Sequence, residues 1–355
     1  MTTCKQCKLC GETKLLEIDG SYGEGGGQIL RNAIAFSVLT DKSIKVTNIR
    51  KNRPNAGIKA QHYIAIKSIK DLFNAEVQGF EIGSSELIFI PGELKSGTYK
   101  FDVGTAGSIT LIFQAIILAC MKTKDDIVIS ICGGTDVKSS PSWDYFENVY
   151  IPIIKKMGYT NTPKLLNRGY YPRGGGEATI IIKPCEKLFP LKLTDEEEFT
   201  SINGKINISN LTDDISTRIK HMIIKNLLKN NYQASILVNR QNSLSAGVGA
   251  TLWTKSKNAI LGSAVIGEKS MSSEELGQNV VMNLIKEINS GATIDVHAFD
   301  QILPFLILAK KNGRSICRIS KLSNHASTSM WLAKKFFKVD FKITKSEDYI
   351  TVEVC

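Results

Sequence analysis

The sequence predicts an α/β fold of the α+β type, in which three copies of a βαβαββ unit form one body and a smaller α/β domain is inserted before the third copy. An aspartate stands at the end of a short predicted strand in each copy, at Asp19, Asp102 and Asp295. An apolar helix of roughly two to four turns and an alternating β run follow this aspartate. A second helix and a pair of strands then complete each copy.

The first two copies occupy residues 15–184. The first begins with a strand at Leu15 to Ile18 and a helix that starts at Gln28, and its later elements are expected in IKAQHYIAIKSIKDLFNA, AEVQGFEI and ELIFIPG. The second begins in YKFDVGTAGSITLIFQAIILACMKTKDDIVISICGG. Its second helix is expected in SWDYFENVYIPIIKKMG and its last strand in GEATIIIKP.

Residues 185–289 break this pattern and are expected to form the inserted α/β domain. Helices are predicted from Ser216 to Leu228 and in SSEELGQNVVMNLIKEI, and strands in ASILVNR and AILGSAVIGE. The third copy occupies residues 290–355. It starts in ATIDVHAFDQILPFLILAKKNGRSICRIS and ends with the helix TSMWLAKKFF and the strands VDFKITKSE and DYITVEVC.

Residues 1–14 are expected to be a disordered extension. Cys4, Cys7 and Cys10 form C-x2-C-x2-C, which resembles half of a metal site, but a fourth ligand at suitable spacing is missing. A disordered extension is therefore favoured over a metal centre. The other cysteines are scattered among apolar residues, as expected of reduced, packed thiols in an intracellular protein.

The composition is that of a globular chain, with 355 residues of which 43% are hydrophobic and 22% charged. No apolar run is long enough to span a membrane and the N-terminus does not resemble a signal peptide, which together predict a cytoplasmic protein with no membrane partner. The net charge of +11 favours a polyanionic partner or substrate, although scattered surface lysines would give the same charge.

The most informative segment is IDGSYGEGGGQILR at residues 18–31. A Gly-rich turn between a strand and a helix N-terminus lets backbone N–H groups approach an anion, and the helix dipole assists. No Lys-Ser/Thr follows the glycines and the dinucleotide spacing is absent, which excludes both common phosphate-binding motifs. Glu24 inside this turn would repel a phosphate unless Mg²⁺ lay between them. A solvated Glu24 in a tight turn is the alternative.

Ligands of α/β proteins bind at the carboxyl ends of the strands, so the loops after the first strands should meet there. This rule brings the GTAGS loop at 104–108 together with the following candidates: Glu24, Gln28, Arg31, His297, Asp300 and Gln301. Arg50 and Arg53 could hold phosphates as bidentate donors or form a solvated charge cluster. Gln61 and His62 follow on a helix, where His62 is either a core hydrogen-bonder or a phosphate contact.

Two further candidates lie at predicted helix starts. Pro141 in SSPSWDYF is typical of a helix N-terminus, although an aromatic residue beside it could also stack on a base. His325 in KLSNHASTSMW lies at the start of the last helix, where the dipole lowers the pKa of an imidazole and keeps it neutral and nucleophilic. From its position alone, His325 is either a structural residue of the helix terminus or a nucleophile.

Taken together, these segments resemble the RNA 3′-terminal phosphate cyclases, in their catalytically competent, archaeal-like branch. The resemblance runs from about Glu17 to Cys355 and is carried by DGSYGEGGGQILR, IRKNRPNAGIKAQH, GTAGS, GGTDVKSSP, YYPRGGGE, GEK, DVHAFDQ and NHASTSMW. It implies repeats like the C-terminal domain of bacterial translation initiation factor 3. It also implies ATP-dependent conversion of an RNA 3′-phosphate to a 2′,3′-cyclic phosphate, through a covalent histidine-AMP and an RNA-adenylate.

The same resemblance assigns roles to single positions. The family's nucleophilic histidine, in H-x-x-T-N, matches His325 with Thr328, whereas Ser329 stands where the family usually has Asn. Glu24 matches the metal- and ATP-site glutamate, with Mg²⁺ or Mn²⁺ as the ion. The other ATP-site matches are Gln28, Arg31, Gln61, Pro141, His297, Asp300 and Gln301. The matches near the RNA phosphate are Arg50, Arg53 and His62.

Two other classes remain as alternatives: a catalytically silent cyclase-like protein that binds RNA during ribosome assembly, and an enolpyruvyl transferase. His325 argues against the first, because such relatives lack the nucleophile. The net charge of +11 and the GEGGGQILR segment argue against the second. The expected partners are ATP and RNA with a 3′-phosphate, and the chain is expected to be a monomer or a homodimer.

Overall fold

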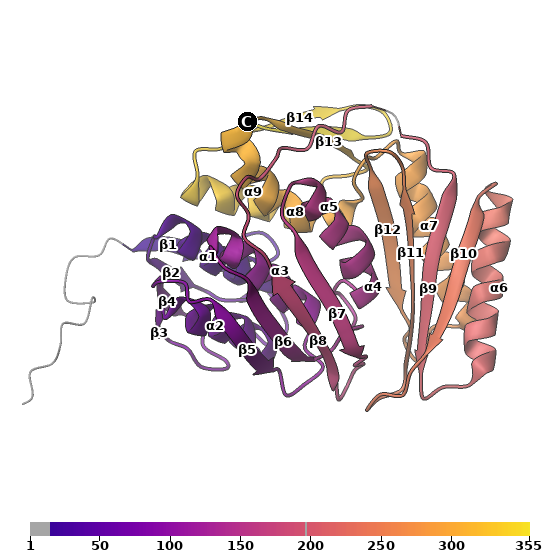
Figure 1. Ribbon diagram of the computed structural model, residues 1–355, viewed down its shortest axis with the longest axis horizontal. Helices are drawn as coiled ribbons and strands as arrows, with labels where there is room; N and C mark the ends of the chain where they lie inside the picture. The colour runs from indigo at the N-terminus through magenta and orange to yellow at the C-terminus, as the bar shows by residue number, and fades with distance from the viewer. Residues whose placement is uncertain (1–14, 196) are drawn as a thin grey trace, which may run out of the picture.

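A computed structural model of the chain describes residues 15–195 and 197–355 (Figure 1). The extension at residues 1–14, with Cys4, Cys7 and Cys10, lies outside the described residues. The predicted mixed α/β fold of repeated units with an inserted domain is confirmed. Within the described ranges, no helix is both long and apolar enough to cross a bilayer.

The first unit is a four-stranded sheet with two helices packed on it. Its elements are β1 (Leu16–Asp19), α1 (Gly27–Thr40), β2 (Ile44–Thr47), α2 (Ala60–Phe73), β3 (Glu76–Gln78) and β4 (Leu87–Ile90). The strand order is β1-β2-β4-β3, with β1 and β2 parallel and the other neighbours antiparallel. The parallel β1–β2 pair, connected by α1, directs the loop after β1 toward the N-terminus of α1.

The second unit repeats this order as β5-β6-β8-β7. Its elements are β5 (Gly97–Asp102), α3 (Ile109–Ala119), β6 (Ile127–Gly133), α4 (Trp143–Tyr145), a π-helical turn (Phe146–Tyr150), α5 (Ile151–Lys156), β7 (Asn161–Asn167) and β8 (Gly176–Ile182). The second helix of this unit, predicted as one helix, therefore contains a π segment. Pro152 follows this segment and has no N–H to donate to the preceding turn, which disturbs regular α geometry there.

The third unit departs from the prediction at its first strand. Its elements are α8 (Val296–Ala309), β13 (Ser315–Ile319), α9 (Asn324–Phe336), β14 (Phe341–Lys345) and β15 (Ile350–Val354). The expected strand before Asp295 is reduced to one bridge residue, Ile294, which pairs with Ile260 of the inserted domain. The Asp295 carboxylate caps α8 by accepting hydrogen bonds from the backbone N–H of His297 (3.1 Å) and of Ala298 (2.9 Å). The same carboxylate accepts a bond from the Tyr145 hydroxyl at 2.5 Å.

Residues 191–193 occupy the place of that missing strand. Leu193 N donates to Ile316 O at 2.8 Å and Ile316 N donates to Leu191 O at 2.7 Å, which sets the segment parallel to β13. Strands β15 and β14 follow in antiparallel order. The third sheet therefore repeats the pattern of the first two, but its first strand precedes the insertion in the chain.

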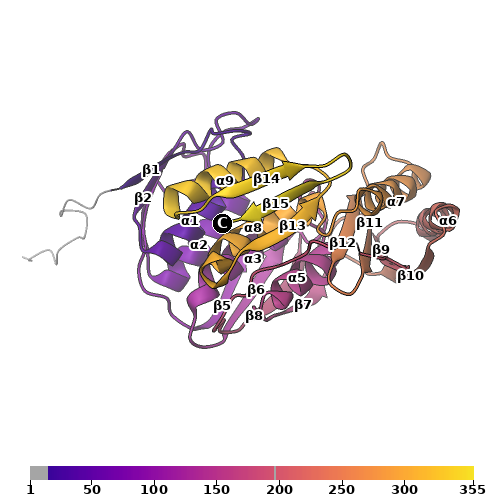
Figure 2. The same ribbon diagram turned by 90° about the horizontal axis from the view of Figure 1, so that it is seen from above.

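The inserted domain has a sheet and a core of its own. Its elements are β9 (Ser201–Ser209), α6 (Asp213–Lys229), β10 (Gln233–Arg240), β11 (Gly247–Lys255), β12 (Ile260–Ile266) and α7 (Ser273–Asn289), with strand order β10-β9-β11-β12. The predicted helices are present, whereas β9 and β11 were not predicted. Figure 2 shows this domain at one end of the molecule, away from β1 and β2.

The helices of the three repeated units pack on one another in a shared core. Helix α1 contacts α2, α3 and α9, and α8 contacts α9 and α3. Phe36, Phe113 and Phe299 are fully buried among them. The five described cysteines are free thiols, as expected, but only Cys120 and Cys317 are buried, whereas Cys132, Cys185 and Cys355 are half-buried. Because α1 packs directly on α9, the Gly-rich loop before α1 meets the N-terminal turn of α9.

Candidate active site

His325 lies in the first turn of α9, where a serine caps the helix. Ser323 has extended backbone geometry, and its Oγ accepts a hydrogen bond from Ala326 N at 2.9 Å. This cap satisfies one of the free N–H groups at the helix terminus and fixes the direction in which the next residues leave the loop. The His325 side chain remains 47% exposed and faces the Gly-rich loop of the first unit.

Gln28 of α1 contacts the imidazole directly, and Gln28 and Asn32 both contact Ser329 of α9. His325 Nδ1 lies 2.9 Å from Gln28 Oε1, while Gln28 Nε2 donates to Ser329 Oγ at 3.0 Å. Asn32 Nδ2 lies 3.3 Å from the same hydroxyl. Since the amide of Gln28 donates toward Ser329, its oxygen is left to accept the Nδ1 proton. This tautomer places the unshared electron pair of His325 on Nε2.

The Nε2 atom of His325 points toward Glu24, whose Oε2 lies 3.7 Å away. Glu24 Oε2 also forms an ion pair with Arg53 Nη2, and Arg53 Nε donates to the Glu24 carbonyl at 3.1 Å. Glu24 is therefore paired with a side chain and is not simply solvated in a turn. A histidine, a carboxylate and a guanidinium from three separate segments meet at this point.

Two glycines allow this close approach. Gly23 has a φ of +59°, and a Cβ there would lie 2.6 Å from Thr328 Oγ1. A Cβ on Gly27 would lie 1.9 Å from His62 Nε2. Any side chain at either position would push the loop away from α9 or from α2. The glycine content of the loop is thus explained by packing against the residues around Glu24.

Burial and neighbouring cations hold His325 in its neutral form. Partial burial lowers its pKa, the charges of Arg53, Arg31 and His297 lower it further, and the Glu24 carboxylate opposes them. His325 is consequently uncharged at neutral pH. Burial also lowers the pKa of Arg31 to about 10.

His62 is a buried residue at the first turn of α2. Its Nδ1 accepts a hydrogen bond from Lys59 N at 3.3 Å, which leaves the proton on Nε2 beside Gly27. Desolvation, together with the charges of Arg31, Arg50 and Lys59, lowers its pKa to about 3. His62 is therefore neutral and supports the floor of the Gly-rich loop.

The candidates of the third unit lie at the start of α8. His297 is exposed, whereas Asp300 is buried. Asp300 Oδ1 accepts a hydrogen bond from the Ser323 hydroxyl and so joins α8 to the cap of α9. Burial raises the pKa of Asp300 to about 7, with Asp295 and Glu24 adding to the effect. Gln301 Oε1 accepts from Gln114 Nε2 at 2.6 Å, and its side-chain oxygen is thus bonded to α3.

Gln61 and Pro141 are connected through the GTAGS loop. Ser108 N donates to Gln61 Oε1 at 3.0 Å, the hydroxyls of Ser108 and Thr110 lie 2.8 Å apart, and Thr110 Oγ1 donates to the Pro141 carbonyl at 2.8 Å. Arg50 instead bonds within its own loop, with Nη1 donating to the Asn55 carbonyl at 2.9 Å.

The structure thus brings Glu24, Gln28, Arg53 and His325 into direct contact. It joins Asp300 to them through Ser323. The supporting roles of Asn32, Ser323 and Ser329 were not predicted from the sequence. A spacing of four residues, from Gln28 to Asn32 and from His325 to Ser329, was the available signal, because such pairs share one helix face.

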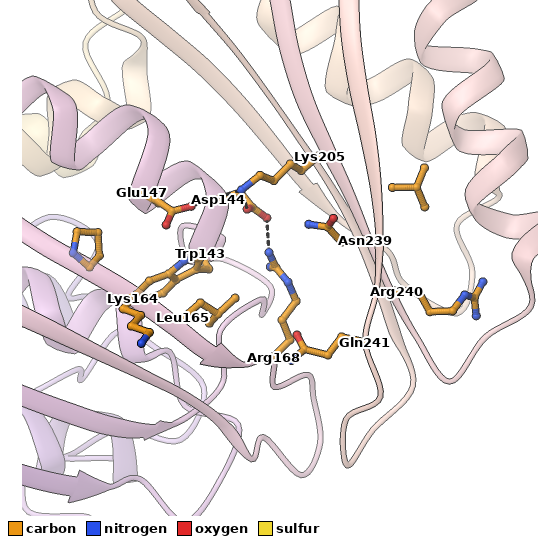
Figure 3. Close-up of a pocket in the computed structure, with 12 residues that line it drawn as sticks. Trp143, Asp144, Glu147, Lys164, Leu165, Arg168, Lys205, Asn239, Arg240 and Gln241 are labelled. Atoms are coloured by element: carbon orange, nitrogen blue, oxygen red, sulfur yellow. Dashed lines mark hydrogen bonds and ion pairs between the residues drawn. The ribbon is translucent and has the colours of Figure 1, made fainter.

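A cavity of about 660 Å³ lies elsewhere, between the second unit and the inserted domain, and none of the predicted site residues lines it (Figure 3). The buried Arg168 guanidinium contacts Asp136 and Asp144 there, at 2.8 Å each. Lys205 of β9 lies 3.2 Å from the Asp144 carboxylate. These paired charges join α4 to the inserted domain, as expected of a structural junction.

The electrostatic contributions predict opposite pKa changes for two substitutions. Glu24→Gln removes the carboxylate that favours the imidazolium, so the pKa of His325 should fall further. Arg53→Gln removes an opposing cation, so this pKa should rise. Titration of the imidazole Cε1–H resonances by NMR measures both changes, and His325→Ala assigns the signal among the four histidines of the chain. Shifts in the same direction for both variants would contradict the proposed geometry.

Sequence comparisons agree with the resemblance. The sequence model for "RNA 3′-terminal phosphate cyclase" matches residues 22–343. A protein of that name from Methanosarcina barkeri is 38% identical over 340 residues, covering 96% of this chain and 100% of the relative. Relatives of the same name are 39% identical in Nitrosospira multiformis, covering 95% of each chain, and 40% identical in Korarchaeum cryptofilum, covering 92% of this chain and 94% of the relative. The chain therefore belongs to the RNA 3′-terminal phosphate cyclase family.

Proposed function

We propose that this protein converts the 3′-terminal phosphate of RNA to a 2′,3′-cyclic phosphate with ATP as co-substrate. The observation that carries the proposal is the placement of a neutral His325, whose Nδ1 is held by Gln28 and whose Nε2 faces Glu24 and Arg53. A neutral, oriented imidazole beside a guanidinium is suited to nucleophilic attack on an anionic phosphorus centre.

In the first step, His325 Nε2 attacks the α-phosphorus of ATP. A bond from Nε2 to phosphorus forms, the bond from phosphorus to the bridging oxygen breaks, and pyrophosphate leaves. Gln28 Oε1 stabilises the Nδ1–H as positive charge develops on the ring. Arg53 stabilises the negative charge on the phosphate oxygens.

In the second step, an oxygen of the RNA 3′-phosphate attacks the AMP phosphorus and releases His325, which gives a diphosphate bond between RNA and AMP. In the third, the vicinal ribose 2′-hydroxyl attacks the 3′-phosphorus and closes the ring. The bond from this phosphorus to the oxygen bridging it to AMP breaks, AMP leaves, and the hydroxyl proton passes to water. The 2′-oxygen is already positioned beside the phosphorus, which gives a large effective molarity. Arg50 and Arg53 are the residues proposed to contact the RNA phosphate directly, and the buried His62 is proposed to act on the phosphate site indirectly, by supporting the Gly-rich loop.

The remaining candidates are proposed to position ATP. Exposed His297 and half-buried Pro141 would contact the base, and the site of the base would be supported by four residues of the elements described above: Asp300, Gln301, Gln61 and Arg31. Gln61 and Gln301 are already bonded to Ser108 and Gln114. Their contribution is therefore expected to come from holding these loops in place.

A divalent ion, Mg²⁺ or Mn²⁺, is proposed beside Glu24. In the described part of the chain, no three His, Cys, Asp or Glu side chains gather as a metal site. One carboxylate fits an ion that arrives with a nucleotide, because Mg²⁺ is commonly held by one or two carboxylates together with phosphate oxygens and waters. When bound, the ion would neutralise charge on the triphosphate.

Incubation with ATP labelled on its α-phosphate, with and without a 3′-phosphorylated oligonucleotide, tests the proposed function. The expected result is a labelled protein without RNA and a cyclic-phosphate end with RNA. A catalytically silent RNA-binding protein would bind the oligonucleotide but take up no label. An enolpyruvyl transferase would neither take up label nor alter the RNA end.

Replacing Glu24 separates a role in metal binding from a purely structural role. Glu24→Ala should slow adenylylation and raise the Mg²⁺ concentration needed for half-maximal rate, because the ion loses its protein carboxylate. The rate of label uptake is measured across a Mg²⁺ titration, with Glu17→Ala on β1 as the control. An unchanged titration curve for Glu24→Ala would show that Glu24 does not hold the ion.

A further inference from the structure

An aromatic pair joins the Gly-rich loop to α9 next to the site. The rings of Tyr22 and Trp331 are stacked, with centroids 3.9 Å apart and planes 5° from parallel. Tyr22 stands two residues before Glu24, and Trp331 lies on the helix that carries His325. Two residues of chain span at most about 7 Å, so the backbone of Tyr22 lies within that distance of the backbone of Glu24.

The pair remains accessible to solvent. Tyr22 is 42% exposed and Trp331 is partly exposed, unlike the fully buried aromatic residues of the core. Complete burial is what gives a large aromatic side chain most of its stabilising effect. Packing of the loop against α9 therefore leaves part of the Tyr22 and Trp331 side chains in contact with solvent.

Cationic groups flank the pair from two elements. Lys335 Nζ lies 5.1 Å from the Trp331 ring centroid. Asn52 Nδ2 donates to the Ser21 carbonyl at 2.8 Å, so the loop that carries Arg53 and exposed Lys51 contacts the residue before Tyr22. An exposed aromatic surface between positive charges matches the combination that proteins use to bind single-stranded nucleic acid, with bases on the rings and phosphates on the cations.

We propose that the Tyr22–Trp331 pair is a stacking platform for a base near the 3′ end of single-stranded RNA, an inference that rests on the proposed function. The terminal phosphate would lie at Arg53. The base of the terminal nucleotide would stack on the Tyr22 side of the pair, because Tyr22 covers one face of the Trp331 ring and Lys335 lies over the other. Stacking does not depend on which base is present, so the platform would position the end of the RNA without selecting its sequence.

Tryptophan fluorescence reports on this platform selectively. The chain has three tryptophans, and Trp143 and Trp253 are only 1% and 8% exposed. Titration with a short single-stranded RNA that carries a 3′-phosphate should therefore quench the emission of Trp331. Trp331→Phe keeps an aromatic ring for stacking and should remove the quenching. Unquenched emission at saturating RNA would overturn the inference.

Abasic oligonucleotides measure the contribution of the base. In the wild-type protein, removal of the 3′-terminal base should weaken binding by roughly 5- to 150-fold, the range for one stacked base. Tyr22→Ala should bind the intact RNA as weakly as the abasic one, whereas Tyr22→Phe should keep the difference. Equal preference for intact over abasic RNA in Tyr22→Ala and wild type would contradict a platform.

Phe189 provides a matched control for these variants. It is 47% exposed and has Lys187 Nζ 5.4 Å from its ring centroid, but it lies beside Gly158, outside the site. Phe189→Ala should leave both oligonucleotide affinities unchanged. Labelling of His325 by ATP needs no RNA, so a failure of the platform with intact labelling overturns only this inference. Absence of labelling in the wild-type protein would overturn the proposed function itself.

Discussion

Replacing His325 by alanine is expected to lower the rate at which label passes from α-labelled ATP to the protein by roughly 10³-fold or more. No other neutral imidazole in the described residues has its Nε2 directed at the Glu24 and Arg53 side chains. The adduct on the wild-type protein should be labile in acid and stable in alkali, as a phosphoramidate is. The measurement is retention of label on the protein after gel electrophoresis, with and without acid treatment.

The fold should survive this substitution, because His325 is half-exposed and its ring makes one hydrogen bond, to Gln28. Circular dichroism checks that expectation. His221→Ala is the matched control, since His221 is exposed on α6 of the inserted domain. If His325→Ala still accepted label, the nucleophile would lie elsewhere, and exposed His297 would be tested next.

With an RNA whose 3′-terminal nucleotide is a 2′-deoxy or 2′-O-methyl nucleotide, the reaction is expected to stop at the RNA-adenylate. The second nucleophile is then missing or blocked, while the phosphate that accepts AMP is unchanged. Gel separation of the oligonucleotide products should show an adenylylated strand that accumulates and a cyclic end that does not form. The loss of cyclisation should be large, because the vicinal 2′-oxygen is held beside the phosphorus and no free hydroxyl can replace it at a comparable effective concentration.

The control is the same oligonucleotide with an unmodified 3′-terminal ribose, which should give the cyclic end and free AMP. Continued release of AMP from the 2′-blocked strand would show that a group other than the vicinal hydroxyl attacks the activated phosphate. Such an outcome would contradict the last step while leaving the histidine-AMP step intact.

Local pattern was sufficient to locate the elements that form the site. The glycines before Gln28 predicted the loop and the start of α1, and the Asn324–Phe336 helix was expected close to where it is found. Both signals lie within about ten residues of chain, where spacing and turn chemistry determine structure. The side chains that support His325 could not be predicted in this way, because Gln28 and Ser329 meet only after α1 packs on α9.

The first strand of the third sheet shows the same limit more clearly. The apolar pattern around Ile294 predicted a strand there, but Asp295 caps α8 and residues 191–193 take the strand's place. Pairing between segments more than 100 residues apart leaves no local signature. Strands β9 and β11 were missed for another reason: their Gly and Asn residues have low β-propensity, and packing in the inserted sheet overrides it.

The displaced strand also bears on folding during synthesis, because it is made before the inserted domain and pairs with a strand made after it. The Leu193 carbonyl accepts a hydrogen bond from Thr293 Oγ1 at 3.3 Å, so the two ends of the inserted segment lie side by side. A flexible loop of about 100 residues would cost about 4 kcal/mol to close. An insert that folds first, around its separate core, has already brought its own ends together and removes most of that cost. We expect the nascent inserted domain to fold before β13 emerges from the ribosome. Residues 191–193 would then already lie next to Thr293, where β13 can pair with them.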